Sequence, residues 1–169
     1  MTEILSIILA FLLIGGSSLF NGPADIGGMT KPKSLPKSYE VSNAKDVDAN
    51  KIIDLINEYR TGKGLNKLSK NDTLKSSSKL KVADMDANDY FGHYSPSGEK
   101  WSVNFKKAGY KYKTSGEVLA IGYATPAEIV IGWENSPSHN NILIYANYKE
   151  INCASIKTLV ACHFGEPTD

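Results

Sequence analysis

Two segments of this chain place a histidine next to a Ser-Pro pair. Residues 91–96 read Phe-Gly-His-Tyr-Ser-Pro and contain His93, and residues 133–139 read Trp-Glu-Asn-Ser-Pro-Ser-His and contain His139. Glu117 follows a glycine between these two segments. Imidazole and carboxylate groups bind divalent metals and act as acids and bases in catalysis. We therefore interpret His93, Glu117 and His139 as a candidate site in one cleft.

These three side chains could provide three ligands to zinc or another divalent cation, with a fourth position open to water. Two structural alternatives stay open. A lone histidine is often only a hydrogen-bonded structural residue, and Glu117 could be a buried carboxylate that accepts backbone N–H groups. His163 lacks a comparable motif and is interpreted as a strand residue. The sequence indicates no cofactor other than a divalent metal.

A metal-assisted hydrolase that uses the same three residues is the alternative function. Ser95, Ser136 and Ser138 lie near histidines in the sequence, so a Ser-His-Glu relay could form. The chain has no Gly-x-Ser-x-Gly turn, no His-Glu-x-x-His motif, no glycine-rich phosphate loop and no Cys-x-x-Cys pair. Turn formation and helix capping explain both Ser-Pro pairs. The enzyme question stays open, and the missing nucleophile motif favours a binding protein.

The elements that must position these residues follow from periodicity and capping. Apolar side chains at helical spacing predict helices over about residues 46–62 and 71–90. A short helix is predicted over residues 101–108, because Gly109 stands where helix C-termini favour glycine. Residues 125–128, Thr-Pro-Ala-Glu, form a capping box with proline at the first helical position, which predicts a further helix from there.

Four runs of β-favouring residues predict strands. Residues 110–114 alternate tyrosine with lysine, as an exposed strand does, and residues 117–123 are mainly apolar, as a buried strand is. Residues 148–156 and 158–164 are separated by a single residue and predict a hairpin.

The hairpin determines whether the two cysteines can meet. A turn centred on Lys157 and Thr158 would place Cys153 opposite Cys162 at a non-hydrogen-bonded pair, where side chains approach closely. In an exported protein this pair could form a disulfide, whereas in a reducing compartment the residues would be two buried thiols. Lys-Thr is also poor chemistry for a tight turn.

The N-terminus predicts export. Residues 4–24 carry no charge and begin with an apolar run. We interpret residues 1–20 as a signal peptide or membrane anchor, residues 21–45, rich in glycine, proline and serine, as a flexible linker, and residues 46–169 as one folded domain. This organisation predicts an extracellular protein, secreted or membrane-anchored, although Glu3 and three downstream lysines are unusual beside an export signal.

Charge argues against one class of partner. The chain has 19 basic and 18 acidic side chains, a net charge of +1 and no arginine-rich run, so we do not expect it to bind nucleic acid. Lysines cluster between residues 63 and 81, and we interpret all of them, Lys81 included, as the solvent face of two helices.

Several motifs, taken in order, resemble the CAP superfamily, which includes cysteine-rich secretory proteins, insect antigen 5 and plant pathogenesis-related 1 proteins. The likeness covers about residues 50–165 and is greatest to short bacterial members with an SCP domain. The motifs are Asn57-Glu58-Tyr59-Arg60, residues 91–96, Ala108-Gly109-Tyr110, Gly116-Glu117, Trp133 and residues 136–143.

The resemblance implies an α+β fold, a three-layer α-β-α sandwich with a central, mainly antiparallel sheet of about three strands. It also implies a large cleft where His93, Glu117 and His139 meet, with a divalent metal, commonly zinc, at the histidines of some members. Two departures bear on this site. Val118 replaces the usual asparagine, and the usual Ser-Pro-Gly-His-Arg reads Ser-Pro-Ser-His-Asn at residues 136–140.

The export-like N-terminus and the missing nucleophile lead to one functional hypothesis. The chain would be a secreted or membrane-tethered binding module for a lipid, a sterol-like molecule or a cell-envelope component. Its N-terminal segment is the part that could reach a membrane.

Overall fold

A mixed β-sheet forms the centre of the molecule. The computed structural model describes residues 31–40 and 45–168. In this part of the chain the sheet has four strands in the order β1-β3-β4-β2. They are β1 (Ser69–Lys70), β2 (Tyr112–Ala120), β3 (Glu150–Ile156) and β4 (Leu159–Pro167). Strand β4 pairs antiparallel with β2 and β3, whereas β1 pairs parallel with β3.

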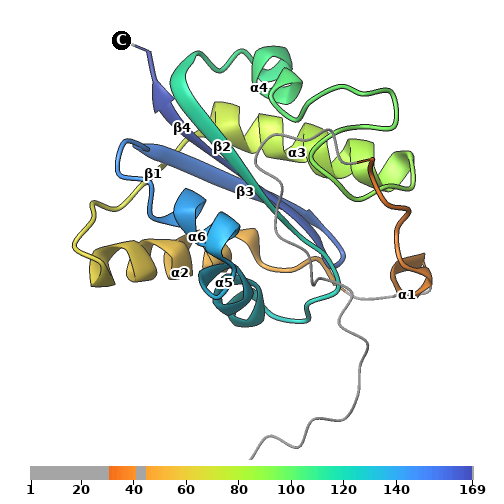
Figure 1. Cartoon of the computed structure of the whole chain (residues 1–169), viewed down its shortest axis with the longest axis horizontal. Coiled ribbons are helices and arrows are strands. Elements are labelled where there is room, and N and C mark those ends of the chain that lie inside the picture. The colour runs from red at the N-terminus through yellow and green to blue at the C-terminus, as the bar shows by residue number, and fades with distance from the viewer. Residues whose placement is uncertain (1–30, 41–44, 169) are drawn as a thin grey trace, which may run out of the picture.

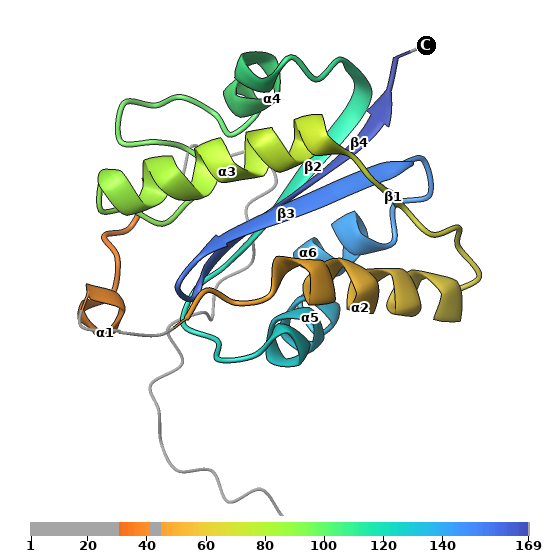
Figure 2. The ribbon, with the colours of Figure 1, turned by 180° about the vertical axis from the view of Figure 1, so that it is seen from behind.

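Helices cover both faces of this sheet (Figure 1, and from behind in Figure 2). One face carries α3 (Asp72–Ala87) and α4 (Val103–Ala108), and the other carries α2 (Ala49–Gly62), α5 (Pro126–Glu134) and α6 (Pro137–Leu143). The predicted α-β-α sandwich is thereby confirmed. The short parallel strand β1 was not predicted from the sequence.

Local capping explains where the helices begin and end. The side chains of Asp48 and Asn71 accept backbone N–H groups at the starts of α2 and α3. At α5, Thr125 and Glu128 form the predicted capping box. Helix α4 ends at Gly109, whose φ of 83° lies in the left-handed region that glycine adopts without strain. All four predicted helices are confirmed.

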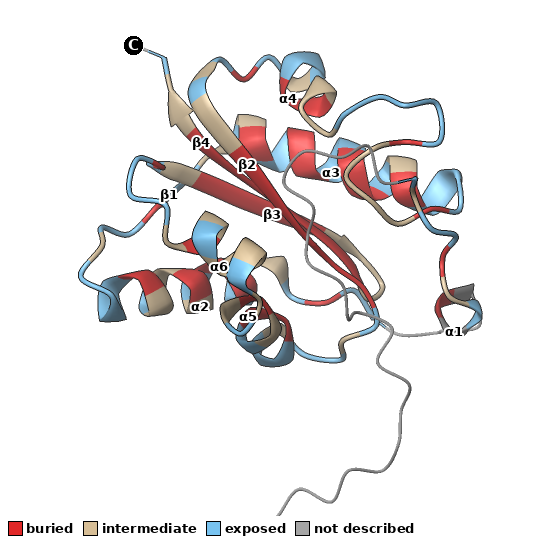
Figure 3. Cartoon of the chain, viewed as in Figure 1, coloured by how far each residue is buried: buried red, intermediate tan, exposed pale blue. Residues whose placement is uncertain are grey.

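The alternation of side chains along the strands divides the core into two layers. Toward α2 and α5, buried residues such as Val118, Trp133 and Phe164 pack together. Toward α3, another buried group includes Met85 and Leu119. Figure 3 shows the buried central parts of the long strands between these layers. Glu117 must therefore face α3, since it alternates with Val118 along β2.

Strand β2 is continuous through Gly116, whereas the sequence predicts two strands with a break before Glu117. The glycine is required for close packing. A Cβ at Gly116 would lie 2.3 Å from the hydroxyl oxygen of Tyr148 and 3.2 Å from Ile142 Cγ2. Gly116 therefore lets α6 and Tyr148 approach the strand, and it does not interrupt it.

The predicted hairpin and its register are confirmed. Cys153 lies opposite Cys162, and the two form a disulfide with a Cα–Cα distance of 4.1 Å. Lys157 in the turn adopts a φ of 51°, which accommodates a turn that its sequence disfavours.

Residues 31–40 make contacts that the predicted flexible linker would not make. Lys33 pairs with Phe91 in an antiparallel bridge, and the Leu35 N–H donates to Asp89 Oδ1 over 3.2 Å. The segment ends in α1 (Lys37–Glu40), whose Tyr39 is only 4% exposed and donates its hydroxyl to Asp86 Oδ1. This packing extends the folded region before residue 46.

The predicted signal peptide or anchor, residues 1–20, lies outside the described residues. Within the ranges that are described, no helix has the length and apolar character needed to cross a membrane.

Candidate functional site

Glu117 is the centre of the candidate site. It lies in β2, its side chain is fully buried, and its two oxygens face two different imidazoles. Oε1 lies 2.6 Å from Nδ1 of His93, and Oε2 lies 2.8 Å from Nε2 of His163. The carboxylate is therefore buried, as one of the structural alternatives predicts. Its hydrogen-bond partners are imidazole side chains, however, and not the backbone N–H groups that this alternative named.

The two imidazoles keep Glu117 ionised. Burial alone would raise the pKa of this carboxyl group, but the hydrogen bonds from His163 and His93 outweigh it and lower the pKa to about 2. An ionised carboxylate has only acceptors, so His93 Nδ1 and His163 Nε2 both donate a hydrogen to it.

His93 lies in the loop after α3, and its side chain is 39% exposed. Lys81 fixes this loop by donating from Nζ to the Gly92 carbonyl over 2.6 Å and to the Tyr90 hydroxyl over 3.1 Å. Lys81 is only 1% exposed, so its predicted place on the solvent face is wrong. Burial lowers its pKa, and the charges of Glu117 and Asp84 act in the opposite direction.

His139 approaches from the opposite helical layer, on α6. Ser136 and Pro137 begin this helix, but the Ser136 side chain makes no capping hydrogen bond to the backbone, and its Oγ lies 2.9 Å from Nδ1 of His139. Burial lowers the pKa of His139, and electrostatic repulsion from His93 lowers it further. We call His93 and His139 the histidine pair.

Residues of the first motif hold α6 in place from α2. Tyr59 donates its hydroxyl to Asn140 Oδ1 over 2.8 Å. Arg60 is completely buried and donates to the carbonyls of Leu143 and Tyr145 at the end of α6. Asn140, which replaces the arginine usual in the family, therefore has a structural partner on α2.

His163 is the residue that sequence reasoning missed. Its position in β4 confirms the interpretation as a strand residue, but it is fully buried and pairs with Glu117 across the sheet. Its Nδ1 lies 2.8 Å from Ser77 Oγ on α3, and its ring stacks on Phe105 with centroids 4.5 Å apart. Only the pairing of β2 with β4 could have indicated this contact.

The structure separates the three predicted metal ligands into two roles. No group of three or more His, Cys, Asp or Glu residues placed to hold one metal ion occurs in the described ranges. Both oxygens of Glu117 accept hydrogen bonds from imidazoles, so Glu117 lies behind His93 as its partner. In each member of the histidine pair Nδ1 is engaged, which leaves Nε2 as the nitrogen for a ligand.

A Ser-His-Glu chain is present, but its geometry does not suit a hydrolase. Ser77, His163 and Glu117 form it, and Ser77 is fully buried in α3. A serine without access to a substrate cannot act as its nucleophile. Ser95 bonds instead to Ser97 and to the Glu99 N–H.

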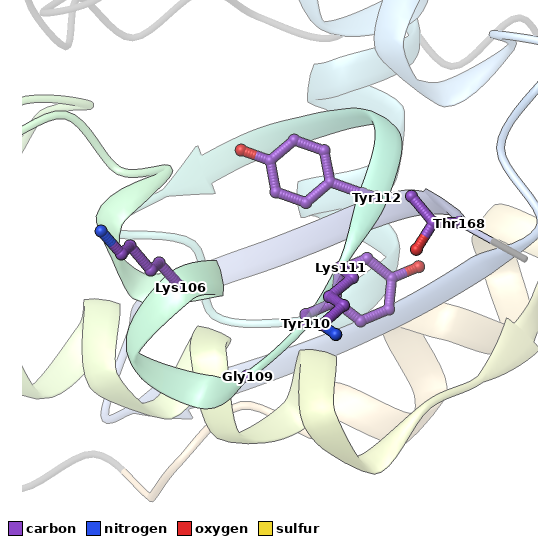
Figure 4. Close-up of a pocket in the computed structure, with 6 residues that line it drawn as sticks. All are labelled: Lys106, Gly109, Tyr110, Lys111, Tyr112 and Thr168. Atoms are coloured by element: carbon purple, nitrogen blue, oxygen red, sulfur yellow. The ribbon is translucent and has the colours of Figure 1, made fainter.

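A separate hollow lies at the start of β2. It has a volume of about 510 Å³ and is lined by Lys106, Gly109, Tyr110, Lys111, Tyr112 and Thr168 (Figure 4). The hydroxyl of Tyr110 donates to Glu150 Oε2 over 2.7 Å. None of the predicted site residues lines this hollow, so its size does not bear on the histidine pair.

Comparison with known sequences gives one family. The model of the cysteine-rich secretory protein family matches residues 53–160. The uncharacterized protein YkwD of Bacillus subtilis is 34% identical over 108 residues, which are 64% of this chain and 42% of that protein. The uncharacterized membrane protein YlbC of the same organism is 26% identical over 125 residues, 74% of this chain and 36% of that protein. The chain therefore spans less than half the length of these curated relatives.

Solved structures share the fold. An extracellular protein containing an SCP domain from Bacillus anthracis aligns with a TM-score of 0.67 at 21% identity, over 69% of this chain and 39% of that one. An outer surface protein from Borrelia burgdorferi aligns with a TM-score of 0.66 at 25% identity, over 74% of this chain and 99% of that one. Both similar proteins are described as extracellular or outer-surface proteins.

Proposed function

Since this chain belongs to the cysteine-rich secretory protein family, we propose that it is an extracellular binding module, secreted or membrane-anchored, whose ligand site is the histidine pair. The observation that carries this proposal is the use of the ring nitrogens. Nδ1 of His93 is engaged by Glu117 and Nδ1 of His139 by Ser136, which leaves both Nε2 atoms for a ligand.

The donor set fits a divalent cation such as zinc. His93 and His139 would hold it, and the remaining positions would belong to water or to the bound partner. Glu117 would stand behind His93, as carboxylates commonly do behind metal-bound imidazoles. A bound cation would attract anionic or carbonyl oxygens of the partner. We place that partner among lipids, sterol-like molecules and cell-envelope components, supported by the extracellular and outer-surface relatives.

Burial removes Ser77 as a nucleophile, so the Ser-His-Glu chain gives no support to a hydrolase. A metal-assisted hydrolase that uses His93, His139 and Glu117 does not need this serine and stays the second candidate function, which metal-dependent turnover lost in His93→Ala would reveal. In both accounts Ser138 and Asn140, where the family usually has glycine and arginine, alter the surroundings of His139 but leave its ring available.

Calorimetric titration with zinc tests the proposal. The full-length chain should bind one zinc ion per molecule, and His93→Ala and His139→Ala should each abolish binding. Lys79→Ala, an exposed change on α3, provides a folded control with unchanged affinity. Equal zinc binding by the wild type and both histidine variants, with folding confirmed by circular dichroism, would refute the assignment.

A further inference from the structure

The fully buried His163 is connected by hydrogen bonds through Glu117 to His93. We propose that His163 is a positioning residue: together with Ser77 it holds Glu117, and Glu117 holds the ring of His93 with Nε2 turned away from the carboxylate, as a ligand requires. This inference rests on the proposed function only in taking His93 as a ligand residue.

An unbroken chain of hydrogen bonds carries the proposal. Ser77 Oγ lies 2.8 Å from His163 Nδ1, and His163 Nε2 lies 2.8 Å from Glu117 Oε2. Glu117 Oε1 then lies 2.6 Å from His93 Nδ1. Because the carboxylate requires a hydrogen on His93 Nδ1, the neutral His93 ring presents an unprotonated Nε2, which is the form that binds a metal.

His163 is suited to this role because its own position is fixed. Its ring is fully buried, stacks on Phe105 at 29°, and has Trp101 at a centroid distance of 6.1 Å. Glu117 is its direct cross-strand neighbour. If His163 could not donate, one oxygen of a buried carboxylate would lose its partner, and Glu117 would be free to turn away from His93.

Two substitutions at one position separate positioning from packing. His163→Met fills the space without a donor, whereas the amide of His163→Gln can still donate to Glu117 Oε2. The readouts, both on the full-length chain, are zinc affinity by calorimetry and the ¹⁵N shifts of the His93 ring in metal-free protein. His163→Met should lower zinc affinity roughly tenfold, the low end of the loss for a partner directly behind a metal ligand, because His163 acts through Glu117. It should also mix the two tautomers of the His93 ring. His163→Gln should keep most of the zinc affinity and most of the wild-type His93 shifts.

Each outcome decides the inference. A folded His163→Met variant with unchanged His93 shifts and unchanged zinc affinity would overturn it. If that variant fails to fold, Ser77→Ala replaces it, because this change keeps the His163 ring but removes the hydrogen bond that orients it, and it should move the His93 shifts in the same direction. Unchanged shifts in Ser77→Ala would then overturn the inference. A wild type that binds no zinc, with His93 shifts that still respond to His163→Met, would refute the metal site and support positioning.

Discussion

Glu117 carries a full charge in a buried position, and its two imidazole partners make this possible. The carboxyl pKa is lowered from its ordinary value of 4.5 to about 2. As the pH falls from about 5 to about 2, Glu117 becomes protonated in the unfolded chain but stays ionised in the folded protein, so the free energy of unfolding decreases toward acid. The predicted loss is on the order of 3 kcal/mol in the free energy of unfolding, measured by urea denaturation between about pH 5 and about pH 2.

Glu117→Gln supplies the control for this pH dependence. The amide does not titrate, so the variant should be less stable at neutral pH and should lose less stability toward acid. Parallel pH curves for the wild type and the variant would show that Glu117 is not the group responsible.

Gly116 gives a prediction about packing. A methyl group at this position would lie 2.3 Å from the Tyr148 hydroxyl oxygen, so Gly116→Ala should lower the free energy of unfolding by about 1–3 kcal/mol. Gly62, where a Cβ would meet nothing within 4 Å, is the matched control, and Gly62→Ala should not destabilise the protein. Adding Tyr148→Phe should recover part of the loss. An additive cost of the two changes would contradict the clash.

Sequence motifs identified His93, Glu117 and His139, because each stands in a short pattern that can be recognised locally. They did not identify His163 or Ser77. These two residues reach the site through strand pairing and helix docking, which depend on contacts between distant parts of the chain, 86 residues apart for Ser77 and His163.

At the level of elements, the segment over residues 31–40 gives the clearest test. Leu35 is 8% exposed, so Leu35→Ala should lower the free energy of unfolding by about 2 kcal/mol. Lys37→Ala, an exposed change in the same segment, should have no effect. Thermal unfolding of both variants provides the measurement. Equal stability of Leu35→Ala and the wild type would show that this segment does not stabilise the fold, as expected of the flexible linker that composition suggests.

Capping and periodicity predicted α2, α3, α4 and α5 because these signals are local. The same reasoning divided β2 at Gly116, since a glycine indicates a turn until its packing partner Tyr148 is known. Helix α6 was not predicted as a helix, because it is short and polar and depends on Tyr59 and Arg60 of α2. Tertiary contacts decided each of these cases.

For the molecule as a whole, the disulfide agrees with an extracellular location. Cys153 and Cys162 are buried in the hairpin that connects β3 to β4. The double substitution Cys153→Ala with Cys162→Ala should lower the free energy of unfolding by about 2–3 kcal/mol, because it frees a short loop in the unfolded chain. Denaturant unfolding of oxidised and reduced wild type gives the comparison. Identical midpoints for the oxidised and reduced forms would contradict this contribution.

The hydrogen-bonded chain through Ser77, His93, Glu117 and His163 also has a consequence for biogenesis. Its members come from α3, the loop after it, and two strands that pair across 46 residues of sequence, so the chain of hydrogen bonds is complete only when these distant segments have folded together. Contacts between distant residues form late in folding, after the loops that separate them have closed. Under the proposed function, affinity for zinc would therefore arise only after the chain has folded, and the unfolded polypeptide would not bind the metal at this site.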